Sequence, residues 1–97
     1  MRYDPQECST MAELRSRIDR IDGELVDLLA LRAAHIDRAV QLKPGEGIPA
    51  RAEDRVAQVI DNVRALARDK ALDPDLAEEL WRILIEWSIR REQRTID

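Results

Sequence analysis

Apolar side chains recur in alternating steps of three and four residues along the first part of the chain. This spacing places them on one face of a helix and is typical of a coiled-coil-like seam. The seam comprises Met11, Leu14, Ile18, Ile21, Leu25 and Leu28, and the apolar face continues through Leu29, Ile36, Ala39 and Val40. The pattern predicts one long helix from about Thr10 to Leu42.

Local signals at both ends support this helix. Thr10 and Glu13 have the spacing of a capping box, in which the hydroxyl and the carboxylate each bind a backbone amide of the other residue. Gly23 interrupts the pattern, but an isolated glycine costs about 1 kcal/mol without ending a helix. We expect the run Pro44-Gly45-Glu46-Gly47 to stop the helix, because proline cannot continue the backbone hydrogen bonds.

The predicted helix is too long for its own chain to cover. About 33 residues at about 1.5 Å each give a rod of roughly 50 Å. A compact chain of about 100 residues has a radius of gyration of only about 13 Å. We therefore expect another chain to cover the seam.

Two shorter helices follow in the sequence. The second is predicted from about Ala52 to Asp69, and the third from Asp73-Pro74, an N-cap followed by a helix-starting proline, to about Arg94. Their predicted apolar faces are Val56, Val59, Ile60, Val63 and Leu66, and then Leu76, Leu80, Ile83, Leu84 and Trp87. The expected fold is all-α, with one long, one short and one medium helix in a single domain, residues 1–97.

Composition excludes several classes of function. The net charge is -4 and no basic stripe dominates, which argues against nucleic-acid binding. No stretch approaches the roughly 20 apolar residues of a membrane span, and no signal peptide is evident, so we expect a soluble cytoplasmic protein. Cys8 is the only cysteine, which predicts a free thiol. His35 has no neighbouring metal ligands, and we expect neither a metal nor a cofactor.

Several cations lie on or beside the seam. Arg32 occupies a position where the apolar alternation predicts a core residue, and Arg15 neighbours a core position. Arg32 and Lys43 are separated by almost three helical turns, about 16 Å along one face, so their long side chains can hold a small anion between them. Arg15 lies about 25 Å from Arg32, so only an antiparallel partner chain brings an Arg15 to the same site. Arg55 can fold over that site as a fourth cation.

The alternative is that these cations form interhelical ion pairs with some of the 20 acidic residues. A charge near a buried seam needs a partner, because an unpaired buried charge costs several kcal/mol.

The spacing of these cations and apolar residues along the chain resembles that of the all-helical chorismate mutase family. The resemblance covers about Met11 to Gln93 and is carried by Leu14-Arg15, Ile18-Asp19, Ile21-Asp22, Leu28 to Arg32, Lys43 and Arg55. It implies an intertwined homodimer with two active sites that bind a small dicarboxylate. It also implies that Arg15 crosses from the partner, that Arg32 and Lys43 bind substrate carboxylates, and that Lys43 reaches the ether oxygen. Arg55 is implied near a carboxylate.

Other positions favour a second member of this family. Cys8-Ser9 and the segment from Ile85 to Ile89 look closer to isochorismate pyruvate lyase. Many mutases have a glutamate that binds the substrate ring hydroxyl where this chain has Val56, and an aspartate where it has Ala52. Their absence is compatible with isochorismate, whose hydroxyl lies elsewhere on the ring. Val56 also fits a plain helix core.

The resemblance places Ser88 and Glu92 in the site as well. The family residue at the position of Glu92 donates a hydrogen bond to the breaking ether oxygen, and a glutamate donates only when protonated. Taken alone, Glu92 fits a solvated residue that pairs with neighbouring arginines. A pericyclic rearrangement needs no nucleophile, only a compact substrate conformation and charge at the breaking bond.

The sequence therefore predicts a chorismate mutase that converts chorismate to prephenate. The predicted catalytic residues are Arg32, Lys43 and Glu92, with Arg15, Arg55, Val56 and Ser88 completing the substrate site. The alternative within the fold is an isochorismate pyruvate lyase that yields salicylate and pyruvate. The alternative outside it is a non-catalytic helical dimerisation module.

Overall fold

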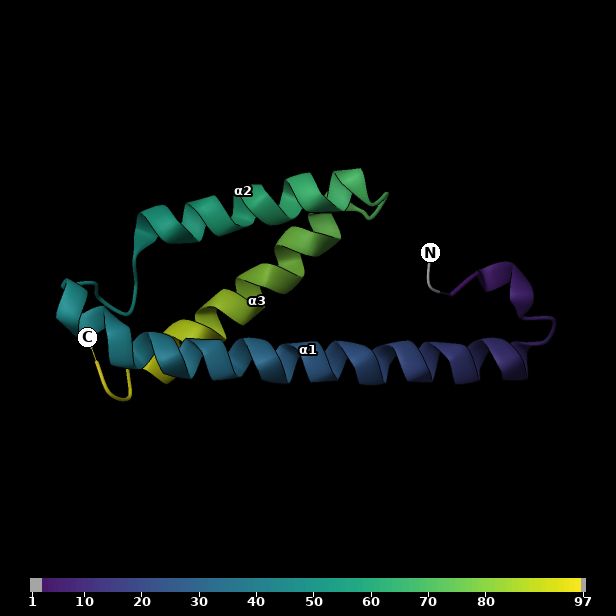
Figure 1. Cartoon of the computed structure of the whole chain (residues 1–97). Helices are drawn as coiled ribbons and strands as arrows, with labels where there is room; N and C mark the ends of the chain where they lie inside the picture. The colour runs from purple at the N-terminus through teal and green to yellow at the C-terminus, as the bar shows by residue number, and fades with distance from the viewer. Residues whose placement is uncertain (1–2, 97) are drawn as a thin grey trace. The chain divides into compact units, whose positions relative to one another are not determined.

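The computed structural model describes residues 3–96, all of whose regular structure is helical. A 3-10 turn, η1 (Pro5–Glu7), precedes the helices α1 (Met11–Glu46), α2 (Glu53–Asp69) and α3 (Pro74–Glu92) (Figure 1). The all-α class and the order of a long, a short and a medium helix are confirmed, whereas η1 was not predicted. None of the described helices has the length and apolar character that crossing a bilayer requires.

The described chain divides into two compact units, one ending at Ala34 and one beginning at His35, so the division falls within α1. In the N-terminal unit, the amide of Glu13 donates to Thr10 Oγ1 at 3.1 Å, as the capping box predicts. The carboxylate of Glu13 accepts from the Ser9 amide at 2.8 Å rather than from Thr10. The predicted reciprocal half of the box is therefore wrong, because the carboxylate reaches one residue further back.

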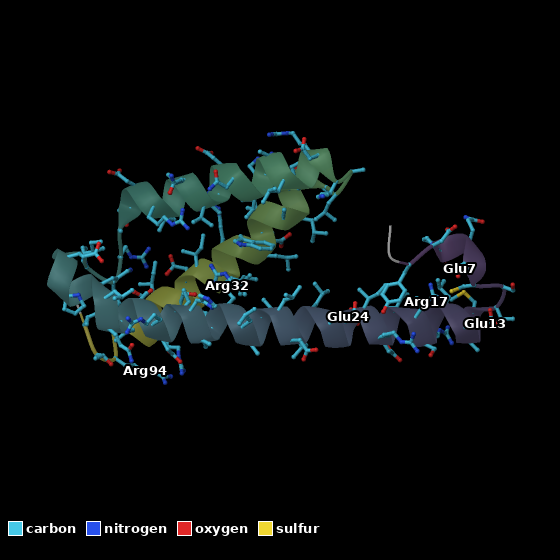
Figure 2. The ribbon with its side chains drawn as sticks, in the orientation of Figure 1. Glu7, Glu13, Arg17, Glu24, Arg32 and Arg94 are labelled. Carbon is cyan, nitrogen blue, oxygen red and sulfur yellow. The ribbon has the colours of Figure 1, made fainter. Side chains whose placement is uncertain are left out.

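The N-terminal segment folds back against α1. Tyr3 Oη donates to Glu24 Oε1 at 2.9 Å, and the guanidinium of Arg17 lies 5.0 Å from the centre of the Tyr3 ring. Figure 2 shows Arg17 and Glu24 on the side of α1 that meets this segment. The exposed apolar residues of α1 include the predicted seam positions Met11, Ile18, Leu25 and Leu28. No described residue of α1 is fully buried.

The end of α1 corrects the sequence prediction. The helix continues through Pro44 to Glu46, although the proline was expected to stop it. The proline removes one backbone bond near the helix end, and the chain then closes the helix with a Schellman motif. The amide of Ile48 donates to Lys43 O at 3.0 Å, that of Gly47 donates to Pro44 O at 3.2 Å, and Gly47 has φ +68°. Lys43 therefore lies inside the last helical turn.

In the C-terminal unit, α2 and α3 are joined by a short turn and pack against each other, and α3 ends beside the last turns of α1 (Figure 1). Ile60 of α2 and Ile85 and Ile89 of α3 form the core. Four residues of the predicted apolar face of α3 are exposed in the single chain, namely Leu76, Leu80, Ile83 and Trp87, and the helix buries Ala77, Ile85, Ser88, Ile89 and Glu92. Leu66 of α2 is also exposed. Since α3 is apolar on two faces, periodicity alone does not identify the one that meets α2.

Candidate active site

Lys43 is the most completely coordinated of the predicted cations. Its Nζ lies 2.7 Å from Glu92 Oε1 and donates to the carbonyl oxygens of Ala50 at 3.0 Å and Pro49 at 3.3 Å. An ammonium has three donors, of which two bind the carbonyl oxygens, and the carboxylate oxygen of Glu92 is in ion-pair contact with the same ammonium. The last turn of α1 supplies the lysine, and the segment between α1 and α2 supplies the two carbonyls.

Glu92 is buried at the end of α3, with 4% of its side chain exposed. This burial excludes the alternative of a solvated surface residue. The contact between Oε1 and Lys43 Nζ lacks hydrogen-bond geometry at Oε1, so the attraction is that of two opposite charges. A buried oxygen without a hydrogen bond is uncommon in proteins and often lies at a functional site.

Ser88 and Val56 occupy the same unit. Ser88 lies one turn before Glu92 on the buried face of α3, and its Oγ donates to Leu84 O at 2.8 Å. Val56 packs against the core of the α2–α3 pair, as the alternative of a plain helix core predicted. A valine there offers methyl groups and no hydrogen bond.

Two of the remaining predicted cations, Arg15 and Arg55, are exposed. Arg55 is exposed at the start of α2, where its Nη1 donates to Gln58 Oε1 at 2.6 Å. Arg15 and Arg32 belong to the N-terminal unit; Arg15 is exposed and Arg32 is half-buried. The structure thus brings the half-buried Lys43 into contact with the buried Glu92, and the buried Ser88 lies one turn earlier on α3.

Two bidentate ion pairs flank this region, and sequence analysis missed both. Arg51 donates to Glu86 through Nη1 and Nη2 at 2.9 and 2.6 Å, which ties the segment before α2 to α3. Arg91 donates to Asp37 through Nε and Nη2 at 2.5 and 3.0 Å, which ties α3 to α1. The hydrogen bonds from Arg51 and Arg91 lower the pKa of Glu86 and of Asp37, respectively. No spacing signal marks these pairs, because their members lie far apart in sequence.

The carbonyls of Pro49 and Ala50 are also contributions that side-chain patterns cannot reveal, because every residue has a carbonyl. Ala50 is almost fully buried, which is unusual for a short connection between helices. The arrangement presents one half-buried ammonium and one buried carboxyl group side by side. It can place positive charge and, when the carboxyl is protonated, a hydrogen-bond donor at a single ligand atom.

Comparisons with known proteins show which family the sequence is similar to. The sequence profile of the chorismate mutase type II family matches residues 14–93. The chain is 33% identical over 89 residues to isochorismate pyruvate lyase of Pseudomonas aeruginosa, covering 91% of this chain and 86% of that protein. It is 30% identical over 76 residues to chorismate mutase of Methanocaldococcus jannaschii, covering 78% and 77%. A T-protein of Enterobacter agglomerans is 30% identical over 82 residues, which cover 84% of this chain and 22% of that protein.

Proposed function

Because this chain belongs to the chorismate mutase type II family, we propose that it is an enzyme that rearranges chorismate to prephenate. The single observation that supports the reaction best is the buried contact between Lys43 and Glu92. Removing charged groups from water costs free energy, and the attraction within a single ion pair rarely offsets that desolvation cost. In a site that binds an oxygen with developing negative charge, Lys43 and Glu92 can both interact with that oxygen.

The proposed reaction breaks the C–O ether bond of the substrate while a C–C bond forms within the same molecule. Negative charge develops on the ether oxygen in the transition state. Lys43 stabilises that charge directly, and a protonated Glu92 donates a hydrogen bond to the same atom. Neither group forms a covalent bond to the substrate, so binding and electrostatics carry the catalysis.

A ligand oxygen reaches Lys43 by replacing one of its present partners. The contact with the Pro49 carbonyl is the longest of the three and lies at an exposed residue. It is therefore the contact that substrate displaces most readily, whereas Glu92 and the buried Ala50 keep the ammonium in place.

The dicarboxylate needs further cations, and we assign Arg32 and Arg55 to its carboxylates together with Lys43. Arg15 is assigned to the site of a second copy of the chain. Exposed apolar residues on α1 support a homodimer, because apolar patches of this extent on a single chain usually mark an interface. The second apolar face of α3, with Ile83 64% exposed, supports it further.

Subunit mixing tests this assignment. Arg15→Ala and Arg32→Ala should each be nearly inactive, and mixing them should restore part of the activity. In a mixed dimer both substitutions fall in one site, which leaves the other site intact. If subunit exchange is verified by mass spectrometry and no activity returns, the two arginines serve the same chain and the crossing is wrong. A stable monomer in sedimentation at micromolar concentration excludes the dimer itself.

Isochorismate pyruvate lyase activity is the second candidate. Val56 favours it, because the valine removes a polar contact that chorismate mutases use for the ring hydroxyl. The 33% identity with the lyase of Pseudomonas aeruginosa points the same way. Both reactions break the same kind of ether bond, so the roles of Lys43 and Glu92 are shared.

Incubation with each substrate separately decides between the candidates. Loss of chorismate with formation of prephenate supports the mutase, and formation of salicylate and pyruvate from isochorismate supports the lyase. Lys43→Ala is the control for contaminating enzymes and should abolish either activity. If neither substrate reacts and a bicyclic dicarboxylate transition-state analogue does not bind, the protein is a non-catalytic helical module.

A further inference from the structure

The contact between Lys43 and Glu92 joins two helices that share little apolar packing in this unit. The core residues Ile60, Ile85 and Ile89 belong to α2 and α3, and α1 contributes none of them. The described part of the chain instead connects α1 to α3 through charged side chains, at Lys43–Glu92 and at Asp37–Arg91. The position of α3 along α1 therefore depends on polar contacts.

The Asp37–Arg91 pair has the geometry to fix that position. Its two parallel hydrogen bonds, at 2.5 and 3.0 Å, define both the distance and the orientation of the groups they join. Arg91 also lies 5.5 Å from the centre of the Trp87 ring, one turn earlier on α3. Stacking on the ring limits the freedom of the guanidinium and directs it towards α1.

The pair lies close to the candidate site on both helices. Arg91 immediately precedes Glu92 on α3, and Asp37 lies six positions before Lys43 on α1. A shift or rotation of the last turn of α3 moves Glu92 relative to Lys43 directly. Both members of the pair are well exposed, 37% for Arg91 and 49% for Asp37, so they contribute little to the core.

We propose that Asp37 and Arg91 are positioning residues, which hold Glu92 against Lys43 without touching the substrate. The proposal rests on the proposed function only for its effect on turnover; its effect on the Lys43 ammonium is independent of any reaction. Misplacement of a catalytic group by about 1 Å can lower a rate by about 100-fold, so a surface pair can matter in this way.

Asp37→Asn tests the proposal, and Asp75→Asn is its matched control. Asp75 also accepts a hydrogen bond from an arginine, Arg64, at 3.1 Å, and it is 86% exposed. It lies 17 residues before Glu92 on the same helix, about 25 Å away. Each variant therefore removes one negative charge from an ion pair that involves α3. Asp37 lies close to the candidate site, and Asp75 lies far from it.

The first measurement is hydrogen exchange of the Lys43 ammonium by NMR, without any ligand. We expect Asp37→Asn to speed this exchange at least about fivefold, because opening of the contact exposes the ammonium to water. Asp75→Asn should leave the exchange rate unchanged.

The second measurement is steady-state kinetics. Asp37→Asn should lower kcat about fivefold or more and change KM by no more than about twofold, since Lys43 and Glu92 act mainly in the transition state. Arg91→Lys keeps the positive charge but loses the two parallel hydrogen bonds. Its ammonium exchange rate and its kcat should lie between those of wild type and Asp37→Asn.

Each outcome decides the proposal. Faster exchange in Asp37→Asn alone supports it, with or without catalytic activity in the wild type. If Asp37→Asn and Asp75→Asn behave alike in exchange, the pair does not position the site and the proposal is wrong. An inactive wild type with the expected exchange pattern contradicts the proposed function and leaves the positioning pair intact.

Discussion

The two ends of α3 carry ion pairs of similar length in different surroundings. At the N-terminal end, Arg64 lies 3.1 Å from Asp75 and 3.0 Å from Glu78, and Arg82 lies 2.8 Å from Glu78. At the C-terminal end, Glu92 lies 2.7 Å from a lysine of α1. Asp75 is 86% exposed, whereas Glu92 is 4% exposed.

On this difference in burial we base the proposal that the C-terminal end of α3 has a functional role and the N-terminal end a structural one. Exposed pairs keep most of their hydration, contribute little to stability and are common on helical proteins. A buried pair must give up its hydration, so it persists only where its geometry is well supported or where a function needs it. Distance alone does not distinguish the two ends of α3, but burial does.

The largest effect should come from Lys43→Ala. Removal of the ammonium leaves Glu92 buried without its opposite charge, which should lower the free energy of unfolding by about 3 kcal/mol. Activity should fall by at least about 100-fold, because the charge at the ether oxygen is lost. Chemical denaturation and steady-state kinetics provide the two measurements.

Arg64→Ala is the comparison at the opposite end of α3. It removes a cation with two carboxylate partners, yet its stability loss should be clearly smaller and its activity unchanged. Equal losses of stability in the two variants would show that burial does not distinguish the two ends.

The next effect concerns the hydrogen-bond donor at Glu92. A glutamine side chain always carries a donor, whereas a carboxylate carries none and repels the negative charge that develops on the ether oxygen. Glu92→Gln should therefore retain or raise kcat in steady-state kinetics. Glu78→Gln is the matched control and should leave kcat unchanged. A kcat well below that of wild type in Glu92→Gln alone would place the donor elsewhere.

The sequence predicted much of the fold, for identifiable reasons. The spacing of apolar residues and the caps gave α2 and α3 to within about two residues, since those signals are local. The end of α1 was wrong because the Schellman motif at Gly47, rather than Pro44, closes the helix. The residues that α3 buries within one chain were missed because that helix has two apolar faces, and only packing against α2 selects between them.

The candidate site was predictable to a lesser extent. Lys43 was identified from its helical spacing to Arg32 and Glu92 from the resemblance to a family, and the structure brings the two into contact. The carbonyls of Pro49 and Ala50 and the pair of Asp37 with Arg91 were missed. Backbone oxygens carry no sequence signal, and a pair 54 positions apart depends on how two helices meet.

A smaller effect is expected from Ser88→Ala. The hydroxyl donates to a carbonyl of its own helix, Leu84 O, at 2.8 Å, so stability should change little. If the hydroxyl turns to the substrate, KM should rise by about fivefold, which corresponds to one neutral hydrogen bond of about 1 kcal/mol.

Asp73→Ala at the other end of α3 should show the reverse behaviour. Asp73 caps the helix by accepting from the Asp75 amide at 2.9 Å. Its loss should lower the free energy of unfolding by about 1 kcal/mol and leave KM unchanged. An unchanged KM in Ser88→Ala would remove Ser88 from the substrate site.

The smallest effect concerns the acid stability of the ion pairs near the start of α3, formed by Arg64, Asp75, Glu78 and Arg82. The hydrogen bond from Arg82, with a further contribution from Arg64, lowers the pKa of Glu78 below its ordinary value. A carboxyl whose pKa is lower in the folded state contributes stability above its unfolded pKa, and that stability is lost as pH falls through the folded pKa. Wild type should therefore have a slightly higher Tm than Glu78→Gln near neutral pH, and the difference should vanish in acid below the lowered pKa of Glu78. Because Glu78 is only half-buried and its main partner Arg82 is exposed, added salt should shrink the difference at neutral pH as well. Calorimetry between acid and neutral pH measures both trends, and a Tm difference that stays constant with pH and salt would show that Glu78 acts through packing rather than charge.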